Sequence, residues 1–168
     1  MTVRPVYLIG FMGSGKSSVG KMCAGQLSVP FIDTDTLVEQ KAQQSISDIF
    51  AEQGEDRFRD IETAVLQNIS REPSIIATGG GIVERERNQK IMDENGVVIY
   101  LHADFATIAN RLQVDSSRPL WNQDLQKRHA LYEQRLPVYR RWGQHVIETD
   151  DKGLEETVQT IMNVIKQV

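Results

Sequence analysis

The chain has 168 residues, of which 40% are hydrophobic and 25% are charged. This length and balance are typical of one globular domain with a sizeable core. The formal net charge of −4 argues against a nucleic-acid partner, since surfaces that bind nucleic acid are normally basic. No stretch approaches the 18 apolar residues of a membrane span, and the N-terminus lacks a signal-peptide pattern. We therefore expect a cytoplasmic protein with no membrane partner.

Cysteine and histidine give no sign of a metal centre. Cys23 is the single cysteine, so an internal disulfide is excluded and a reducing compartment is indicated. Val19, Cys23 and Leu27 recur at helical spacing, which favours a buried apolar role for the thiol over a nucleophilic one. The three histidines are far apart, and we expect no zinc or haem site.

A phosphate-binding loop opens the chain. Tyr7–Ile9 is a short apolar run that predicts a buried strand, and a helix is expected from about Lys16 to Leu27. Between them, Gly10, Gly15, Lys16 and Ser17 have the P-loop spacing G-x-x-x-x-G-K-[ST]. Such a loop brings backbone N–H groups to a polyphosphate, while its lysine reaches the β- and γ-phosphates and its hydroxyl can ligate Mg²⁺.

Two aspartates follow the second predicted strand. Phe31 and Ile32 open this strand, which ends in Asp33-Thr34-Asp35. Residues two apart on a strand share a face, so we expect both carboxylates to point the same way, at the edge where parallel sheets bind ligands. Either aspartate could instead cap the helix expected near Thr36, and Asp35 is the better placed for this.

Residues 36–71 are expected to be mostly helical, with a turn at Gly54, and to form an insertion beside the sheet. Arg59 and Glu62 are three residues apart and can pair on one helix face. From spacing alone this pair is best interpreted as a surface salt bridge.

Three consecutive glycines, Gly79–Gly81, end the third predicted strand, Ser74–Ala77. A flexible turn rarely needs three glycines, so we interpret them as a loop that lets a ligand approach the backbone closely. Further strands are expected at Val97–Leu101 and His145–Thr149. Helices are expected at Glu84–Glu94, Phe105–Leu112 and Leu125–Arg141, the last with a kink at Pro137, and after Gly153. The polar segment 113–122 has the composition of a mobile lid.

Five short strands alternating with helices predict one α/β domain over residues 1–168, with a parallel sheet of the P-loop type. The guanine-specific tetrapeptide Asn-Lys-x-Asp and the transporter signature Leu-Ser-Gly-Gly-Gln are both absent from the sequence. Among the functions of P-loop proteins, these absences favour a small-molecule kinase. Such an enzyme must align an acceptor hydroxyl with the γ-phosphate and exclude water, as an insertion and a lid would do.

The chain resembles the shikimate kinase family along its whole length. The motifs that carry the resemblance are Gly-Phe-Met-Gly-Ser-Gly-Lys-Ser at 10–17, Asp33-Thr34-Asp35, Phe58-Arg59-x-x-Glu62, Gly79-Gly80-Gly81, Arg118-Pro119-Leu120 and Arg135-x-x-x-Tyr139. The resemblance implies ATP-dependent phosphorylation of the 3-hydroxyl of shikimate, in chorismate and aromatic amino-acid biosynthesis, by a monomeric enzyme that uses Mg²⁺. It also implies a substrate-binding region at about 33–62 and a lid at about 112–124.

Residue roles follow from the same resemblance. It implies that Lys16, Asp35 and Arg118 are catalytic, with Asp35 as positioner of the hydroxyl and candidate general base. It implies that ATP is bound by Gly13, Ser14, Gly15, Lys16, Ser17, Ser18, Arg111, Arg118 and Lys152. Shikimate would be bound by Asp35, Arg59, Gly79, Gly80, Gly81 and Arg135, and Mg²⁺ by Ser17 and Asp33. The resemblance changes the interpretation of Arg59 from surface salt bridge to substrate ligand, with Glu62 orienting it.

Two other functions stay open from the sequence. A gluconate kinase has a similar P-loop, although it has no reason to carry both the triple glycine and the Arg118-Pro119 lid. A catalytically silent nucleotide-binding module would be expected to lose Asp35 or the substrate arginines, and the sequence retains them all.

Overall fold

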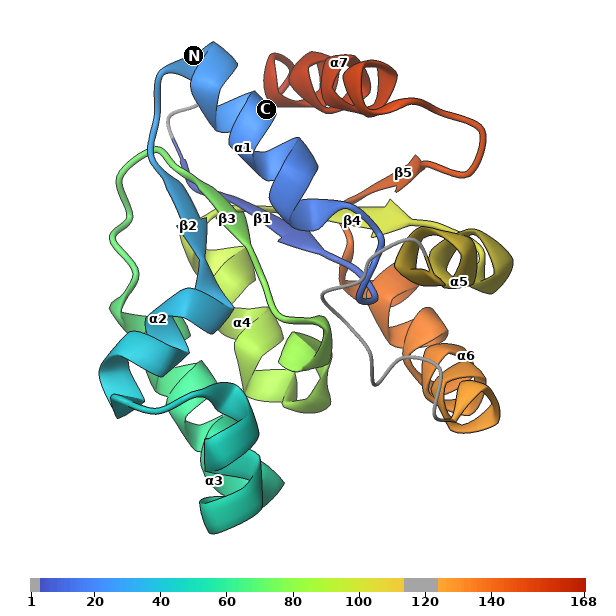
Figure 1. Cartoon of the computed structure of the whole chain (residues 1–168). Coiled ribbons are helices and arrows are strands. Elements are labelled where there is room, and N and C mark those ends of the chain that lie inside the picture. Colours follow the sequence, from blue (N-terminus) through green and yellow to red (C-terminus); the bar gives the residue numbers. More distant parts are fainter. Residues whose placement is uncertain (1–3, 114–123) are drawn as a thin grey trace.

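A computed structural model describes residues 4–113 and 124–168 of the chain, and these contain one sheet of five parallel strands (Figure 1). The strands lie in the order β2-β3-β1-β4-β5. Their bounds are β1 Val6–Ile9, β2 Phe31–Asp33, β3 Ile75–Ala77, β4 Val97–His102 and β5 His145–Glu148. All five expected strands are thus confirmed to within two residues. Both neighbours of β1 are parallel to it, so the P-loop leaves the middle of the sheet at its carboxyl edge.

Helices cover both faces of the sheet because its central strand is buried on both sides. Val6 and Leu8 pack in one cluster with α1 (Lys16–Leu27) and α7 (Leu154–Ile165). Tyr7 and Ile9, on the other face, pack with the end of α3 (Ile46–Asn68), α4 (Glu86–Asn95), α5 (Phe105–Gln113) and α6 (Leu125–Trp142). This alternation is the two-residue period of a strand, and every residue of β1 is buried. Cys23 of α1 lies buried in the first cluster, as expected.

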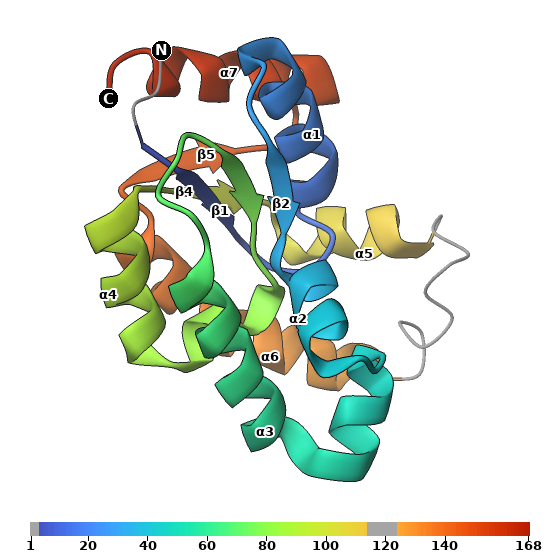
Figure 2. The ribbon, with the colours of Figure 1, turned by 90° about the vertical axis from the view of Figure 1, so that its left-hand side faces the viewer.

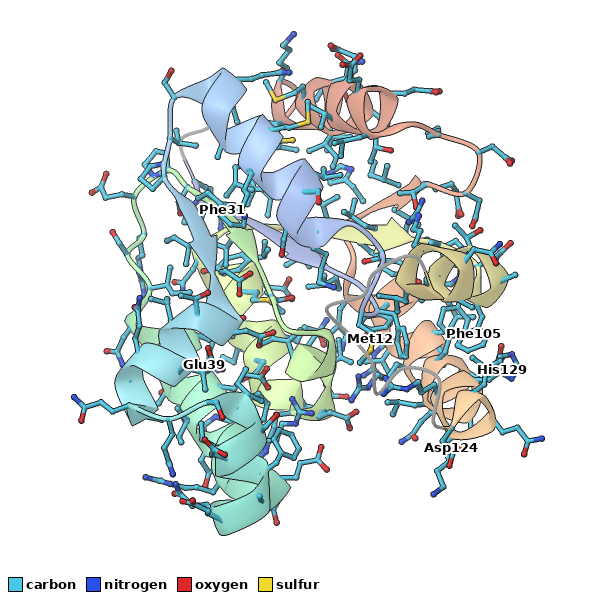
Figure 3. The ribbon with its side chains drawn as sticks, viewed as in Figure 1. Met12, Phe31, Glu39, Phe105, Asp124 and His129 are labelled. Carbon is cyan, nitrogen blue, oxygen red and sulfur yellow. The ribbon has the colours of Figure 1, made fainter. Side chains whose placement is uncertain are left out.

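Close packing of α1 on the sheet depends on a glycine. Phe31 of β2 lies beneath α1, as its label in Figure 3 indicates. A Cβ added to Gly20 would stand 2.7 Å from the Phe31 ring. The small residue therefore lets α1 approach the strands, which fixes the first turn of α1 beside the P-loop.

Helices α2 (Thr34–Ala42) and α3 extend beyond the carboxyl end of β2, as Figure 2 shows from the side. They have a small apolar cluster of their own, formed by Val38, Ile49, Phe58, Ile61 and Val65. At Gly54 the backbone has φ 82° and ψ 169°, which breaks α3 into two helical segments. The expected insertion and its turn at Gly54 are confirmed.

Helices α5 and α6 precede and follow residues 114–123, which lie outside the described residues. These residues include Arg118 and most of the expected lid. The two helices contact each other through Phe105 and His129, whose ring centroids are 4.7 Å apart in an edge-to-face arrangement (Figure 3). Helix α6 continues through Pro137 without interruption. Among the described residues, no helix combines the length and apolar character needed to cross a membrane.

Candidate active site

The P-loop joins β1 to α1 and holds its lysine against the backbone. Gly13 and Gly15 have φ values of 80° and 97°, in the left-handed region that glycine adopts without strain. The Nζ atom of Lys16 donates to the carbonyl oxygens of Gly10 and Phe11, at 2.7 and 3.0 Å. Gly15 is the N-cap of α1 and has no side chain, so the first N–H groups of the helix are open to an anion.

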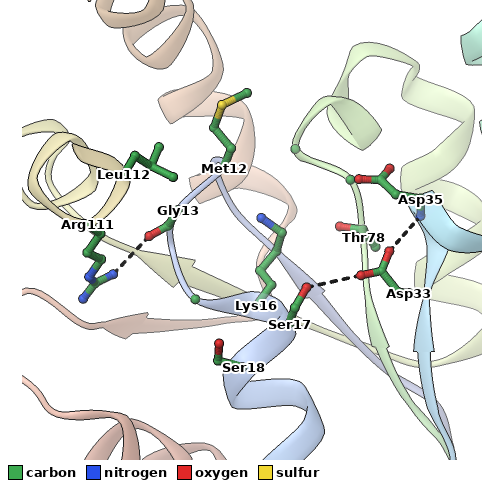
Figure 4. Close-up of a pocket in the computed structure, with 13 residues that line it drawn as sticks. Met12, Gly13, Lys16, Ser17, Ser18, Asp33, Asp35, Thr78, Arg111 and Leu112 are labelled. Carbon is green, nitrogen blue, oxygen red and sulfur yellow. Dashed lines mark hydrogen bonds between the residues drawn. The ribbon is translucent and has the colours of Figure 1, made fainter. Parts of the chain in front are cut away.

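A cavity of about 310 Å³ lies in front of the P-loop, at the carboxyl edge of the sheet (Figure 4). Its lining consists of Met12, Gly13, Gly15, Lys16, Ser17, Ser18, Asp33, Asp35, Thr78, Gly79, Gly80, Arg111 and Leu112. On its floor, Ser17 Oγ donates to Asp33 Oδ2 at 3.2 Å. A hydroxyl and a carboxylate are oxygen ligands of the kind that Mg²⁺ prefers, so this pair could hold the ion beside the polyphosphate.

Asp33 and Asp35 both line this cavity, but for a reason other than the one expected from the sequence. Helix α2 begins at Thr34, so Asp35 lies in the first helical turn rather than on the strand. The N-cap is Asp33, whose Oδ1 accepts from the N–H groups of Asp35 and Thr36 at 2.9 and 3.3 Å. The prediction that Asp35 is the better cap was therefore wrong. Asp33 satisfies the free N–H groups, and the Asp35 carboxylate stays available to the cavity.

A second cavity of about 550 Å³ lies between α3, the glycine loop and α6. Met12, Asp35, Gly79 and Gly80 line both cavities, so the two are adjoining compartments that meet at Asp35. The remaining walls combine apolar side chains with two arginines and three glutamates: Ile46, Phe50, Phe58, Leu131, Glu55, Glu62, Glu84, Arg59 and Arg135, besides Gly81 and Gln134. Such a compartment suits a carboxylated ligand of modest size.

Both arginines are buried and held by carboxylates. Arg59 Nη1 donates to Glu62 Oε1 at 2.9 Å, and Arg59 Nη2 donates to Glu55 Oε1 at 3.1 Å. Arg135 Nε donates to Glu84 Oε1 at 2.7 Å. Burial alone would lower the pKa of Arg59, but the carboxylates of Glu62 and Glu55 raise it above its usual value. The expectation from spacing alone, a surface salt bridge between Arg59 and Glu62, was wrong, because Glu62 is only 1% exposed.

The carboxyl groups of Asp35 and Glu62 have raised pKa values. For Asp35 the first cause is burial and the second is the nearby charge of Asp33, while Lys16 and Arg59 oppose the shift. For Glu62 burial raises the pKa to about 7 against the opposing effect of Arg59, and the charge of Asp35 adds to it. Glu62 Oε2 is a buried oxygen without a hydrogen-bond partner. Asp35, which lines both compartments, and Glu62, which lines the second, are therefore weaker acids than usual. A group that accepts a proton is expected to have a raised pKa of this kind.

The glycine loop is held by hydrogen bonds at its first two residues and lies against side chains that line the cavities. Gly79 N donates to the buried hydroxyl of Thr34 at 3.0 Å, and Tyr139 donates to Gly80 O at 2.5 Å. A Cβ at Gly79 would stand 2.6 Å from Asp35 Oδ1 and 3.0 Å from Glu62 Oε2. Residues Gly80–Glu84 form a short 3-10 helix that the sequence did not predict. The glycines thus belong to a hydrogen-bonded, partly helical segment rather than to an irregular turn.

A third cavity of about 290 Å³ adjoins the P-loop on the side of α7. Arg111 crosses between the first and third cavities, donating to Thr149 O at 3.1 Å and to Gly13 O at 3.4 Å. Lys152 lines the third cavity together with Ser14 and Ser18. All the site residues expected from the sequence line one of these three cavities, except Arg118, which lies outside the described residues.

Four side chains hold the glycine loop or the two arginines in place and were given no such role from the sequence: Thr34, Glu55, Glu84 and Tyr139. Glu55 lies four residues before Arg59, and this helical spacing was an available signal. Thr34 and Tyr139 belong to motifs quoted for the resemblance, but no pattern in the sequence gives a partner for either side chain. Glu84 is 51 residues from Arg135, and only the fold brings them together.

A P-loop at the carboxyl edge of a five-stranded parallel sheet, with a second polar compartment beside it, defines a P-loop kinase of small molecules. The sequence model of the family described as "Shikimate kinase" matches residues 12–166. A shikimate kinase of Bacillus mycoides (strain KBAB4) is 39% identical over 166 residues, which cover 98% of each chain. One from Sulfurihydrogenibium sp. (strain YO3AOP1) is also 39% identical, over 98% of this chain and 99% of its own. The chain belongs to the shikimate kinase family.

Solved structures agree with this assignment. The shikimate kinase from Acinetobacter baumannii, solved in complex with shikimate, superposes with a TM-score of 0.89 at 33% identity, over 99% of this chain and 94% of that one. A gluconokinase from Sinorhizobium meliloti 1021 has a TM-score of 0.59 at 18% identity, over 97% and 91% of the two chains. The second likeness is one of fold alone.

Proposed function

We propose that this chain transfers the γ-phosphoryl group of ATP to the 3-hydroxyl of shikimate and so forms shikimate 3-phosphate, in chorismate and aromatic amino-acid biosynthesis. The observation that carries the proposal is the position of Asp35 on the wall shared by two compartments. One compartment has the P-loop lysine, and the other has two buried arginines. Donor and acceptor sites of a two-substrate kinase are expected to meet in this way.

On the donor side, ATP lies along the P-loop, with Gly13, Ser14, Gly15, Ser17 and Ser18 around its phosphates. Lys16 exchanges its two carbonyl partners for the β- and γ-phosphates and stabilises the charge of the transferring group. Ser17 and Asp33 would hold Mg²⁺, which the 3.2 Å contact between their oxygens supports, and the ion would neutralise charge on the phosphates. Arg111 and Lys152 lie toward the nucleoside end, in the third cavity.

On the acceptor side, Arg59 and Arg135 clamp the carboxylate of shikimate, because paired guanidinium groups fix both its position and its orientation. The backbone of Gly79–Gly81 contacts a ring hydroxyl, and Asp35 accepts a hydrogen bond from the hydroxyl that is phosphorylated. The raised pKa of Asp35 suits a group that takes up the proton as the phosphoryl group arrives.

The proposal also includes a substrate-binding region at about 33–62 and a lid at about 112–124 that carries Arg118 onto the ATP phosphates. The proposed enzyme acts as a monomer.

A coupled assay of ADP release tests the proposal, with shikimate, gluconate or no acceptor added. We expect release that depends on shikimate and on Mg²⁺. Activity with gluconate but not with shikimate would contradict the proposal, and release that ignores both acceptors would indicate a plain ATPase. Asp35→Asn should lower kcat by about 10² or more if the carboxylate takes up the proton. A near-normal rate would leave Asp35 with a positioning role only.

A further inference from the structure

Both bidentate edges of the Arg59 guanidinium group are engaged by side chains of the chain itself. A guanidinium group offers a carboxylate two such edges, the pair Nη1 and Nη2 and the pair Nε and Nη2. Glu62 Oε1 accepts from Nη1 at 2.9 Å. Glu55 Oε1 accepts from both Nη2, at 3.1 Å, and Nε, at 3.3 Å. Neither edge is fully available to a substrate carboxylate while both glutamates keep these contacts.

The two glutamates differ greatly in how easily they can leave. The Glu62 side chain is 1% exposed and the Glu55 side chain is 59% exposed. Moving Glu62 away from Arg59 would leave a buried carboxyl group without its partner, whereas an exposed carboxylate that leaves its partner is solvated by water. Glu55 is therefore the partner that an incoming carboxylate can displace, and the edge that it vacates is the Nε and Nη2 pair.

The position of Glu55 gives it room to leave. Glu55 lines the second cavity, which is the acceptor compartment of the proposed function. It directly follows Gly54, where the left-handed backbone (φ 82°) interrupts α3. Glu55 thus stands at the start of the second helical segment, and its side chain reaches forward one turn to Arg59.

Charge in the compartment favours the exchange. The described residues that line it include the carboxyl groups of Asp35, Glu55, Glu62 and Glu84 against the guanidinium groups of Arg59 and Arg135. An incoming carboxylate therefore meets an excess of acidic groups, and the outward movement of Glu55 reduces that excess at the point of binding.

We propose that Glu55 is a specificity-determining residue that holds the Nε and Nη2 edge of Arg59 until the substrate carboxylate displaces it. This inference rests on the proposed function, because it requires an acceptor with a carboxylate. A ligand that gains only the Arg59 contact competes poorly with Glu55. A ligand that also reaches Arg135 and the glycine loop has the additional contacts needed to displace it.

Steady-state kinetics of Glu55→Ala and Glu55→Gln test the proposal, with Glu52→Ala as the matched control. Glu52 lies on the same helix and is exposed, and its carboxylate accepts from Gln44 rather than from Arg59. We expect the Glu55 variants to lower KM for shikimate about two- to fivefold, the range that corresponds to an exposed ion pair. KM for ATP should stay unchanged, and the control should match the unaltered enzyme.

Cyclohexanecarboxylate, a ring with a carboxylate and no hydroxyl group, provides a second measurement that does not need turnover. Titration calorimetry should show tighter binding to Glu55→Ala than to the unaltered chain, by a similar factor. A KM for shikimate that is unchanged or raised in both Glu55 variants, or cyclohexanecarboxylate binding that does not tighten, would overturn the role of Glu55. Absence of shikimate phosphorylation by the unaltered chain would instead contradict the proposed function, and the binding measurement would still decide the role of Glu55.

Discussion

The guanidinium group of Arg59 lies directly against the backbone of Gly81. A Cβ at this glycine would stand 2.5 Å from Arg59 Cζ and closer still to both Nη atoms. The centroid of the Phe58 ring lies 4.9 Å from the same Cζ. The third glycine of the loop is therefore required by the packing of the arginine. Our expectation from the sequence, a glycine needed for the approach of a ligand, gave only part of the reason.

Gly81→Ala should consequently displace Arg59 and raise KM for shikimate about 5- to 150-fold, since overpacking of this kind costs about 1–3 kcal/mol. KM for ATP should change much less. Gly25→Ala in α1 is the control, because a Cβ there would meet no atom within 4 Å and Gly25 lines none of the three cavities. Steady-state kinetics with each substrate varied in turn would check this. Equal KM values for shikimate in the two variants would separate Arg59 from the acceptor site.

Lys16 is only 8% exposed and contacts two carbonyl oxygens of its own loop. Lys16→Met should lower kcat about 10²- to 10³-fold, because it removes a preorganised positive charge from the transferring group. Circular dichroism would verify that the fold persists, and single-turnover phosphoryl transfer would measure the rate. A loss confined to KM for ATP would assign Lys16 to nucleotide binding alone.

Asp33 caps α2 and, in the proposed function, also holds Mg²⁺, and one substitution can separate these two roles. Asn is as good an N-cap as Asp, so Asp33→Asn should leave α2 intact and the melting temperature nearly unchanged. The loss of its negative charge should raise the Mg²⁺ concentration for half-maximal activity about 10- to 100-fold. Activity measured across a Mg²⁺ titration at fixed ATP would test this. An unchanged Mg²⁺ requirement would remove Asp33 from the metal site.

The sequence predicted the fold well because its signals were local. The P-loop spacing, the buried strands and the break at Gly54 each depend on a few neighbouring residues, and each is present in the structure. Asp33 was ranked below Asp35 as a cap because β2 changes to helix at Thr34, without any intervening turn residue. Asp35 could therefore be assigned to the strand or to the helix. We assigned it to the strand, where residues two apart share a face, although it belongs to the helix.

The partners of the two arginines that line the second cavity were harder to find. Glu84 contacts Arg135 across 51 residues, and Tyr139 contacts Gly80 across 59. These contacts arise only when α6 packs beside the glycine loop, so no pattern within the sequence encodes them. The burial of Glu62 likewise depends on the tertiary structure, since spacing alone cannot distinguish an exposed pair from a buried one.

That burial makes Glu62 a source of pH-dependent stability. Its pKa is raised from 4.5 to about 7 in the folded chain, chiefly by burial. Between these two pH values the folded chain keeps a proton that the unfolded chain has lost. The contribution of Glu62 is therefore fully present below about pH 4.5 and is lost as pH rises through about 7. The charges of Arg59 and Arg135 oppose the shift, and the charge of Asp35 adds to it.

Glu62→Gln replaces the titrating group with a neutral one of nearly the same shape and should remove this dependence. Between pH 5.5 and 8.5 the unaltered chain should lose about 2 kcal/mol of stability relative to the variant, equivalent to about 4–8 °C in melting temperature. Melting curves of both proteins at the two pH values would measure the difference.

Glu52→Gln, which alters an exposed carboxylate on the same helix, should behave as the unaltered chain does. A gap between Glu62→Gln and the unaltered chain that stays constant with pH would mean that Glu62 keeps its charge throughout this range. Its role would then be limited to orienting Arg59 through their 2.9 Å ion pair.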